Sequence, residues 1–157
     1  MECHIRAARA EDYGQVNAIV KEGQDEHAKA LPHIFSAVET VMPYEYFASL
    51  LASEAEHLLV AELDEQIVGF LVIEAKNAPP FESLVSRRFA YIHDFGVRES
   101  CQRKGIGNAL FAAAQDWAKA HGASSLELTV WSFNEGAIRF YKTLGMEQVS
   151  VKMQLAL

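Results

Sequence analysis

The feature that most restricts the fold of this chain is the hexapeptide QRKGIG at residues 102–107. A strand-like segment, FAYIHDFGV, precedes it, and a helix-like segment, NALFAAAQDWAKAHG, follows it. Ser, Thr, Asp or Asn usually caps the first free N–H groups of a helix, but none of them stands directly before the two glycines. The pattern predicts a strand, a tight loop and a helix whose first N–H groups have no side-chain partner.

The basic residues of this loop, Arg103 and Lys104, lie at the helix end where the macrodipole disfavours a cation. A bound anion removes that conflict, because the free N–H groups point at it and the basic side chains flank it. Gly105 and Gly107 let the backbone approach such an anion closely. The alternative is a solvated basic turn. Neither a GxxxxGK[ST] loop nor a dinucleotide-binding GxGxxG pattern is present.

The loop resembles the Q/R-x-x-G-x-G/A pyrophosphate-binding motif of the GCN5-related N-acetyltransferases, the GNAT family. Val97 matches the residue that ends the preceding strand in that family. A second match, to the pattern N-x-x-A-x-x-x-Y-x-x-x-G, runs through Asn134, Ala137, Tyr141 and Gly145. The N-terminal segment and the stretch LLVAELDEQIVGFLVI resemble the family more loosely.

This resemblance implies an α/β acyl-CoA N-acyltransferase (GNAT) fold, with a mixed, partly splayed central sheet flanked by helices. It implies direct transfer of an acetyl group from acetyl-CoA, a co-substrate, to a primary amine, without a metal. Backbone N–H groups of the strand would polarise the thioester oxygen, and Tyr141 would protonate the departing thiolate. The cofactor-binding residues that it implies are Phe95, Val97, Gln102, Arg103, Lys104, Gly105, Ile106, Gly107 and Asn134. Without the family, Asn134 could equally be a helix cap and Tyr141 a half-buried core residue.

The strand before the loop carries two candidates for the general base, His93 and Asp94. An unperturbed imidazole pKa of about 6.5 lets histidine take a proton near neutrality. Strict alternation sets Asp94 on the face opposite His93, unless a bulge re-aims it. For both residues, a structural role as a hydrogen-bonded group at a sheet end stays open.

Periodicity and breakers give the remaining elements. The hairpin is expected to have a three-residue connection, and Ser132 is expected to cap the last helix in an S-x-x-E box, which would leave Asn134 free. The predicted strands are 4–7, 58–63, 67–73, 89–97, 125–131 and 146–155, and the predicted helices are 11–20, 44–52, 106–120 and 135–144. The expected order is β-α-α-β-β-β-α-β-α-β.

The segment 23–53 is the part of the chain that shapes the acceptor pocket in the resembled family. Its ring-bearing residues are therefore candidates for substrate contact, although packing around two helices would explain them equally well. They are His27, His33, Phe35, Tyr44, Tyr46 and Phe47.

Composition limits the function classes. Of the 157 residues, 50% are apolar and 22% are charged, which predicts one globular domain over residues 1–157. A formal net charge of −7 argues against nucleic-acid binding and mildly favours a cationic acceptor. No apolar run is long enough for a signal segment or a membrane span, and two cysteines make no disulfide framework. A cytoplasmic protein is expected, and a homodimer is compatible with the sequence.

The favoured function is acetylation of a small-molecule amine. The alternatives are an acetyltransferase for protein N-termini or lysines, and a non-catalytic sensor of acyl-CoA. The tyrosine at 141 favours chemistry over sensing.

Overall fold

The computed structural model describes residues 2–157, in which five strands form one mixed sheet whose spatial order follows the sequence. The strands are β1 (His4–Ala7), β2 (Glu56–Leu63), β3 (Gln66–Asn77), β4 (Arg88–Val97) and β5 (Leu126–Leu128). Neighbouring strands are antiparallel except for β4 and β5, which are parallel and pair at only three positions. The predicted mixed, partly splayed sheet is confirmed.

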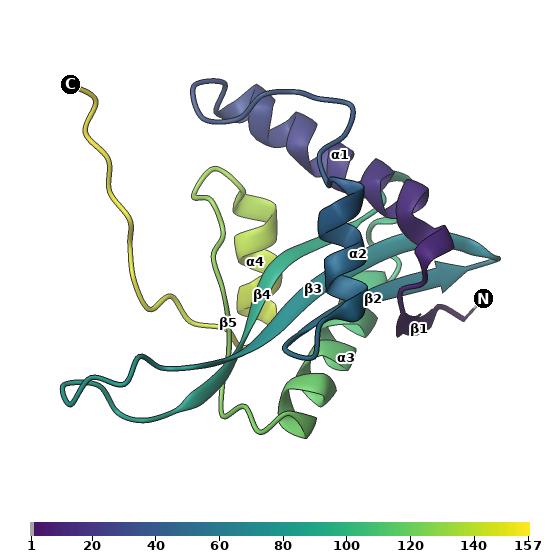
Figure 1. Cartoon of the computed structure of the whole chain (residues 1–157). Coiled ribbons are helices and arrows are strands. Elements are labelled where there is room, and N and C mark those ends of the chain that lie inside the picture. Colours follow the sequence, from purple (N-terminus) through teal and green to yellow (C-terminus); the bar gives the residue numbers. More distant parts are fainter. Residues whose placement is uncertain (1) are drawn as a thin grey trace.

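Helices cover both faces of this sheet (Figure 1). They are α1 (Tyr13–Ala30), α2 (Tyr44–Ala52), α3 (Ile106–Ala120) and α4 (Glu135–Thr143), with short 3-10 turns at Ala10–Asp12 and Glu99–Cys101. Successive residues of a strand point to opposite faces. Leu58 and Val60 accordingly pack with α1 and α2, whereas Leu59 and Ala61 pack with α3. The sheet therefore separates two apolar cores.

The first helix is longer than predicted. It runs through Gly23 to Ala30, where the sequence suggested an end near residue 20. A glycine inside a helix costs only about 1 kcal/mol, which tertiary packing outweighs. Gln24, one turn past the predicted end, donates a hydrogen bond to the Ser36 carbonyl and so ties the extension to the following loop.

The hairpin connection is shorter than predicted. Asp64 and Glu65 both have positive φ angles, of 50° and 63°, and they alone join β2 to β3. Positive φ at both central residues is the requirement of a type I′ turn, whose twist matches that of the two strands. Gln66, assigned to the turn by sequence, is the first residue of β3.

The predicted last strand is wrong. Residues 146–157 pair with no strand of the described chain and leave the body of the protein as an extended segment (Figure 1). The predicted strand 125–131 is likewise reduced to Leu126–Leu128, because β5 diverges from β4 after that point.

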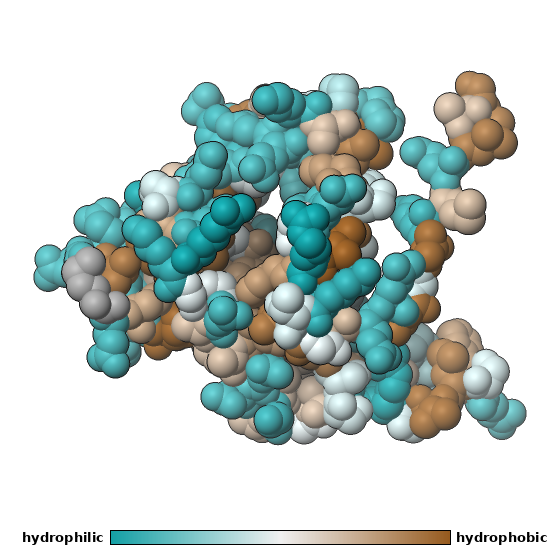
Figure 2. Space-filling view, turned by 180° about the vertical axis from the view of Figure 1, so that it is seen from behind, coloured by the Kyte–Doolittle hydropathy of each residue, from teal (hydrophilic) through white to brown (hydrophobic). Residues whose placement is uncertain are grey.

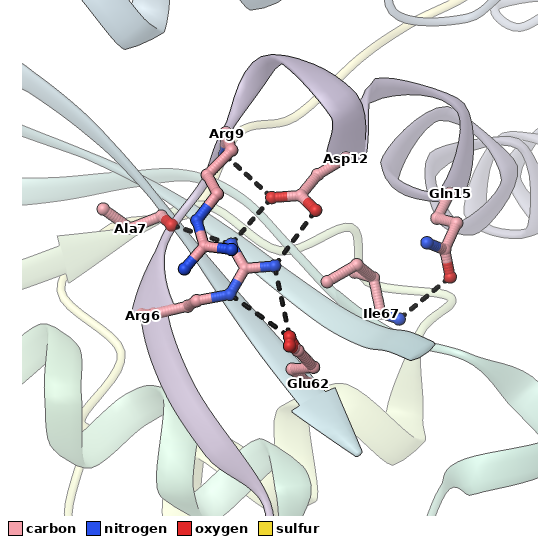
Figure 3. Close-up of polar contacts among 7 residues, drawn as sticks. All are labelled: Arg6, Ala7, Arg9, Asp12, Gln15, Glu62 and Ile67. Atoms are coloured by element: carbon pink, nitrogen blue, oxygen red, sulfur yellow. Dashed lines mark hydrogen bonds and ion pairs between the residues drawn. The ribbon is translucent and has the colours of Figure 1, made fainter. Parts of the chain in front are cut away.

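An ionic network fastens β1 to the start of α1 and to β2 (Figure 3). The Arg6 guanidinium donates to both Asp12 carboxylate oxygens, at 2.8 and 3.0 Å, and to Glu62 at 3.4 Å. The Arg9 N–H donates to Asp12 at 2.8 Å. Burial alone would raise the pKa of Asp12, but these hydrogen bonds outweigh it and lower that pKa. Asp12 is thus held as a carboxylate although it is only 4% exposed.

Within residues 2–157, no helix has the length and apolar character needed to span a bilayer.

Candidate active site

The loop at residues 102–107 joins the turn after β4 to the first turn of α3 (Figure 1). Gly105 is the N-cap of α3, in the left-handed conformation with φ +82°, and no side chain caps the helix. Arg103 also has a positive φ, of 63°. The predicted uncapped helix start is confirmed, and the loop is held in a conformation that favours glycine at position 105.

The first N–H groups of α3 have no hydrogen-bond partner within the described residues 2–157. Within residues 2–157, the first N–H of the helix to find a carbonyl is that of Ala109, which donates to Gly105 at 3.1 Å. Those of Ile106, Gly107 and Asn108 remain free, as the first N–H groups of a helix do without a cap. The side chain of Ile106 is buried in the core, so only its backbone can serve a ligand.

Gly107 has a second reason to lack a side chain. A Cβ atom at this position would lie 3.3 Å from Cζ of Phe140 on α4. The glycine therefore lets α3 and α4 approach each other beside the loop. Gln102, in turn, donates from Nε2 to the Val97 carbonyl at 3.2 Å and ties the loop to the end of β4.

A β-bulge interrupts the pairing of β4 with β3. Val72 pairs with Asp94 and Ile73 with Ile92, so His93 is the extra residue. A bulge breaks the alternation of faces. Ile92 packs on the α3 side together with Phe95, although the two residues are three apart and strict alternation would set them on opposite faces.

The bulge directs His93 and Asp94 to the same side of the sheet. Strict alternation would have set them on opposite faces, and the alternative with a bulge is the one that occurs. His93 Nε2 lies 2.7 Å from Glu74 Oε1, and Glu74 pairs with Tyr91 on that side. The pKa of Tyr46, on α2, is raised by burial and then by nearby Glu56, Asp94 and Glu74. These carboxylates therefore gather under α2, around the bulge.

Asp94 opens to the cleft but is crowded by protein atoms. This desolvation raises the pKa of its carboxyl, against the opposing effects of the Phe95 N–H and of His27 and His93. The Phe95 N–H donates to Asp94 Oδ1 at 3.0 Å. A carboxylate with a raised pKa is a better proton acceptor than an ordinary aspartate.

The outer edge of β4 is free where β5 diverges. Because the Arg98 N–H donates to the Val68 carbonyl on β3, alternation turns the backbone groups of Phe95 and Val97 away from β3. The Gln102 side chain reaches the Val97 carbonyl from that side. Backbone N–H groups of β4 therefore face the opening between β4 and β5.

Helix α4 brings Asn134 and Tyr141 to the same opening. The prediction that Ser132 caps this helix is wrong: Asn134 is the N-cap and accepts a hydrogen bond from the Ala137 N–H at 3.2 Å. Its amide NH₂ has no partner within residues 2–157 and can still donate to a ligand. Burial, followed by the charge of Asp94, raises the pKa of Tyr141 to about 12.

One cleft of about 840 Å³ joins these groups. Its walls include nearly all the residues singled out from sequence: His93, Asp94, Phe95, Val97, Gln102, Arg103, Gly107, Asn134 and Tyr141. Lys104, Gly105 and Ile106 lie outside its lining, although they belong to the same loop. The charged walls differ in sign, since α1 contributes Glu22 and Glu26, whereas the loop and α4 contribute Arg103 and Arg139.

Four rings form a wall beside this cleft, which we call the aromatic wall: His27, Phe35, Trp131 and Phe133. His27 meets Phe35 at 5.1 Å and Phe133 at 5.3 Å between ring centres, and Phe35 meets Trp131 at 5.3 Å. The wall joins the end of α1 and the loop after it to the segment between β5 and α4 (Figure 1). Aromatic rings carry a negative face that attracts cations.

Only two of these four rings were predicted from the sequence to lie at the site, His27 and Phe35. Trp131 was predicted to be part of a strand, and Phe133 was not a candidate. Of the other ring-bearing candidates of segment 23–53, Tyr46 lies on α2 near Asp94, although it does not line the cleft. Three lie elsewhere: Phe47 is buried in the core with Tyr13, Tyr44 packs on Tyr13, and His33 is exposed outside the cleft.

Comparison with known proteins shows the family to which the chain belongs. Residues 21–146 match the model of the Acetyltransferase (GNAT) family. Over 106 residues the chain is 35% identical to an uncharacterized N-acetyltransferase of Methanocaldococcus jannaschii; the match covers 68% of this chain but only 46% of that protein. It is 30% identical over 155 residues to the N-alpha-acetyltransferase of Sulfurisphaera tokodaii, covering 96% of this chain and 83% of the relative.

Among solved structures, the chain is similar to a protein of Bacillus halodurans that was crystallised as a tetramutant. The two share 32% sequence identity, with 98% of this chain and 99% of the other superposed at a TM-score of 0.95.

Proposed function

The chain belongs to the GNAT family of N-acetyltransferases, and on that premise we propose that it transfers the acetyl group of acetyl-CoA to the primary amine of a small cationic molecule. The observation that carries the proposal is the single cleft that contains an uncapped helix start, a protonated phenol and a desolvated carboxylate. The family's enzymes use acetyl-CoA, and the loop at residues 102–107 has the groups to hold its pyrophosphate.

The fit to acetyl-CoA rests on charge and on hydrogen-bond donors. The free N–H groups of Ile106, Gly107 and Asn108 suit a diphosphate, because a helix N-terminus attracts anions. Arg103 and Lys104 flank it. The Val97 N–H, which faces the opening, and the Asn134 amide suit the amide-rich arm of the molecule, whereas the Phe95 N–H is already bonded to Asp94. When bound, acetyl-CoA supplies a thioester carbonyl for an amine to attack.

The chain's own part in the chemistry is to move protons. An acceptor amine with a pKa near 10 arrives as ammonium and must lose a proton before it can attack. Asp94, with its raised pKa, is the proposed acceptor of that proton, directly or through water, and His93 is the second candidate. The Tyr141 hydroxyl keeps its proton at neutral pH and can give it to the departing sulfur. An N–H of β4 can donate to the carbonyl oxygen as it gains charge.

The remaining walls of the cleft support a small cationic acceptor. Glu26 on α1, together with Asp94, adds negative charge to the walls of the cleft, which suits a cation, whereas the Glu22 carboxylate accepts a hydrogen bond from the Glu99 N–H beside the loop. The contacts between Phe35 and Trp131 and between His27 and Phe133 close one side of the cleft. A small amine fits such a closed side more readily than an extended peptide.

A second candidate is the acetylation of protein N-termini. The relative from Sulfurisphaera tokodaii, which matches 96% of this chain, is named an N-alpha-acetyltransferase. The same loop, Tyr141 and Asp94 would serve that reaction, so only the acceptor distinguishes the two candidates.

The deciding experiment measures acetyl-CoA-dependent release of free thiol with a panel of polyamines, amino acids and aminosugars against a panel of peptides. Turnover on small cationic amines should exceed turnover on every peptide. Turnover restricted to peptide N-termini would replace the proposal by the second candidate. Binding of acetyl-CoA without turnover on any amine would support a sensor instead.

A further inference from the structure

Glu22 of α1 is a carboxylate beside the loop that carries the proposed anion site. It lines the same cleft as Arg103, a basic residue of that loop. A negative side chain at such a place weakens the attraction for an anion, because like charges repel. Within residues 2–157, no Lys or Arg side chain pairs with Glu22, and its neighbour Lys21 is bound to Asp25 at 2.9 Å. The position of this carboxylate therefore needs an explanation other than its charge.

The Glu22 carboxylate accepts a hydrogen bond from the main chain at the base of the loop. Its Oε2 atom lies 2.8 Å from the N–H of Glu99, which is 77 residues later in the chain. Hydrogen bonds to a charged acceptor are roughly twice as strong as neutral ones. The other oxygen of Glu22, Oε1, has no hydrogen-bond partner in the part of the chain that the structure describes, residues 2–157. One oxygen atom thus makes the contact, and any oxygen at that place could accept the bond.

The Glu99 N–H begins the 3-10 turn that leads into the loop. Arg98, the N-cap of this turn, forms no side-chain cap, so Glu22 supplies the cap from another helix. The turn is closed by the Cys101 N–H, which donates to the Arg98 carbonyl at 2.8 Å. Residues 102–104 alone separate the turn from the N-cap of α3. The place of the turn therefore sets the course of the loop.

Other contacts hold the strand side of the loop. The Arg98 N–H donates to the Val68 carbonyl at 2.7 Å, and the Arg98 guanidinium donates to the Ile67 carbonyl at 3.0 Å. Gln102 ties the loop to the end of β4. Glu22 adds an anchor from α1. The base of the loop is thus held from β3, from β4 and from α1.

The part of α1 that carries Glu22 depends on polar contacts. The buried residues of this helix end at Val20. The last turns of α1 lie at the top of Figures 1 and 2, where the space-filling view is mostly hydrophilic. Beyond Val20, Gln24 donates to the Ser36 carbonyl and Glu22 accepts from Glu99. The bond of Glu22 therefore fixes the end of α1 and the base of the loop relative to each other.

We propose that Glu22 is a positioning residue for the acetyl-CoA loop: its carboxylate caps the turn Glu99–Cys101 from α1 and so holds residues 102–107 in the shape that binds the diphosphate. The ligand of the loop is acetyl-CoA by the proposed function, so the role of Glu22 rests on that function. The hydrogen bond favours binding of the diphosphate, whereas the charge opposes it. The two effects have opposite signs and can be separated by substitution.

Two variants separate the hydrogen bond from the charge. Glu22→Gln and Glu22→Ala both remove the negative charge, but only glutamine keeps an oxygen that can accept from the Glu99 N–H. In calorimetry, Glu22→Gln should bind acetyl-CoA as tightly as the wild type or up to about threefold more tightly, and Glu22→Ala about fivefold more weakly than Glu22→Gln. Alanine is the better helix former, so a loss of affinity in Glu22→Ala does not come from unwinding of α1. In turnover, KM for acetyl-CoA should follow these affinities, with kcat the same in both variants within about twofold.

Glu26 supplies the matched control, one turn further along α1. It lines the same cleft, and within residues 2–157 its carboxylate makes no hydrogen bond to the loop. Glu26→Gln and Glu26→Ala should therefore bind acetyl-CoA with equal affinity, within about twofold. Equal affinities of Glu22→Gln and Glu22→Ala would overturn the proposal, and so would a difference of the same size in the Glu26 pair.

Hydrogen exchange of the protein without ligand tests the bond itself. The N–H groups of Glu99 and Cys101 should exchange at least about 10-fold faster in Glu22→Ala than in the wild type or in Glu22→Gln, because the turn loses its cap. If the exchange of Glu99 alone becomes faster and that of Cys101 is unchanged, the bond forms without holding the turn, and the proposal is wrong. A wild type that does not bind acetyl-CoA would remove the proposed function, and the exchange rates would still decide whether Glu22 holds the loop.

Discussion

Asp94 on β4 and Tyr141 on α4 line the same cleft, and the negative charge of Asp94 adds to burial in raising the pKa of Tyr141 to about 12. The proposed base and the proposed acid are thus coupled through the charge of Asp94. An ionised Asp94 strengthens the hold of Tyr141 on its proton. The coupling keeps a base and an acid available together at neutral pH.

Tyr141→Phe tests the acid. We expect kcat to fall about 10-fold or more with little change in the affinity for acetyl-CoA, because general acid catalysis acts in the transition state. With a pKa of about 12, the wild-type hydroxyl stays protonated from pH 6 to 9, so the ratio of the two rates should be constant over that range. Tyr44→Phe, outside the cleft, is the control and should leave kcat unchanged. Full kcat in Tyr141→Phe would make the residue structural.

Asp94→Asn tests the base. In the proposed mechanism the carboxylate accepts the proton, and its pKa is raised, so wild-type kcat/KM should increase as the pH rises through that pKa. The variant should lose about 10²-fold in kcat together with this acid limb. Because removal of a desolvated charge relieves the folded state at neutral pH, its Tm should be equal to or above that of the wild type. If instead His93→Gln abolishes the limb and Asp94→Asn keeps it, the two residues exchange roles.

Reversal of the loop charges tests the anion site. Arg103→Glu with Lys104→Glu should weaken acetyl-CoA binding at least 10-fold in calorimetry, since two attractive charges become repulsive beside a diphosphate. The effect should shrink with added salt, because both side chains are exposed. Lys119→Glu, at the opposite end of α3, supplies the control. Equal affinity in all three proteins would require another pyrophosphate site.

Phe35→Ala tests the acceptor side. The ring contacts both His27 and Trp131, so its loss opens the aromatic wall. We expect KM for a small amine to rise about 10-fold, while the Kd for acetyl-CoA stays within about twofold. If the substrate is a peptide, opening the wall should instead leave KM unchanged or lower it. Circular dichroism spectra and Tm values check that the variant is folded.

Asp12→Asn tests the ionic network of Figure 3. Removing one partner of a nearly buried pair should lower the free energy of unfolding by about 3 kcal/mol at pH 7. The folded-state pKa of Asp12 is lowered, so this stabilisation is present above its unfolded pKa of about 3.9 and is lost as the pH falls through the lower folded value. Denaturation of wild type and variant should therefore converge in acid. Asp25→Asn, in the exposed pair with Lys21, should change stability by less than about 1 kcal/mol.

The parts of the candidate site that depend on neighbouring residues in the chain could be predicted from the sequence. The loop at residues 102–107 could be predicted because glycine spacing, a missing cap and two basic residues all occur within six positions. Tyr141 followed from its resemblance to a family motif. In both cases the structural consequence lies within a few residues of its cause.

The features that the sequence did not predict depend on contacts between residues far apart in the chain. The bulge at His93 exists because β4 pairs with β3 one residue out of step, and no local pattern encodes that register. Asn134 displaced Ser132 as the cap because the Asn134 N–H is turned back to the Trp131 carbonyl, which starts the helix later. The aromatic wall required α1, the following loop and the segment after β5 to meet in space.

The approach of Gly107 to Phe140 makes one glycine a spacer as well as a member of the loop. Phe140 precedes Tyr141 on α4. A side chain at position 107 is therefore expected to push Phe140 away and to shift Tyr141, the proposed proton donor, with it. A methyl group there is expected to disturb turnover before it disturbs binding of the diphosphate. A second substitution of Phe140 by a smaller residue should then restore turnover, even though position 140 is not a defined position of either motif. The width of the gap between two helices, more than the chemistry of the loop, would then determine which substitutions at position 107 are tolerated.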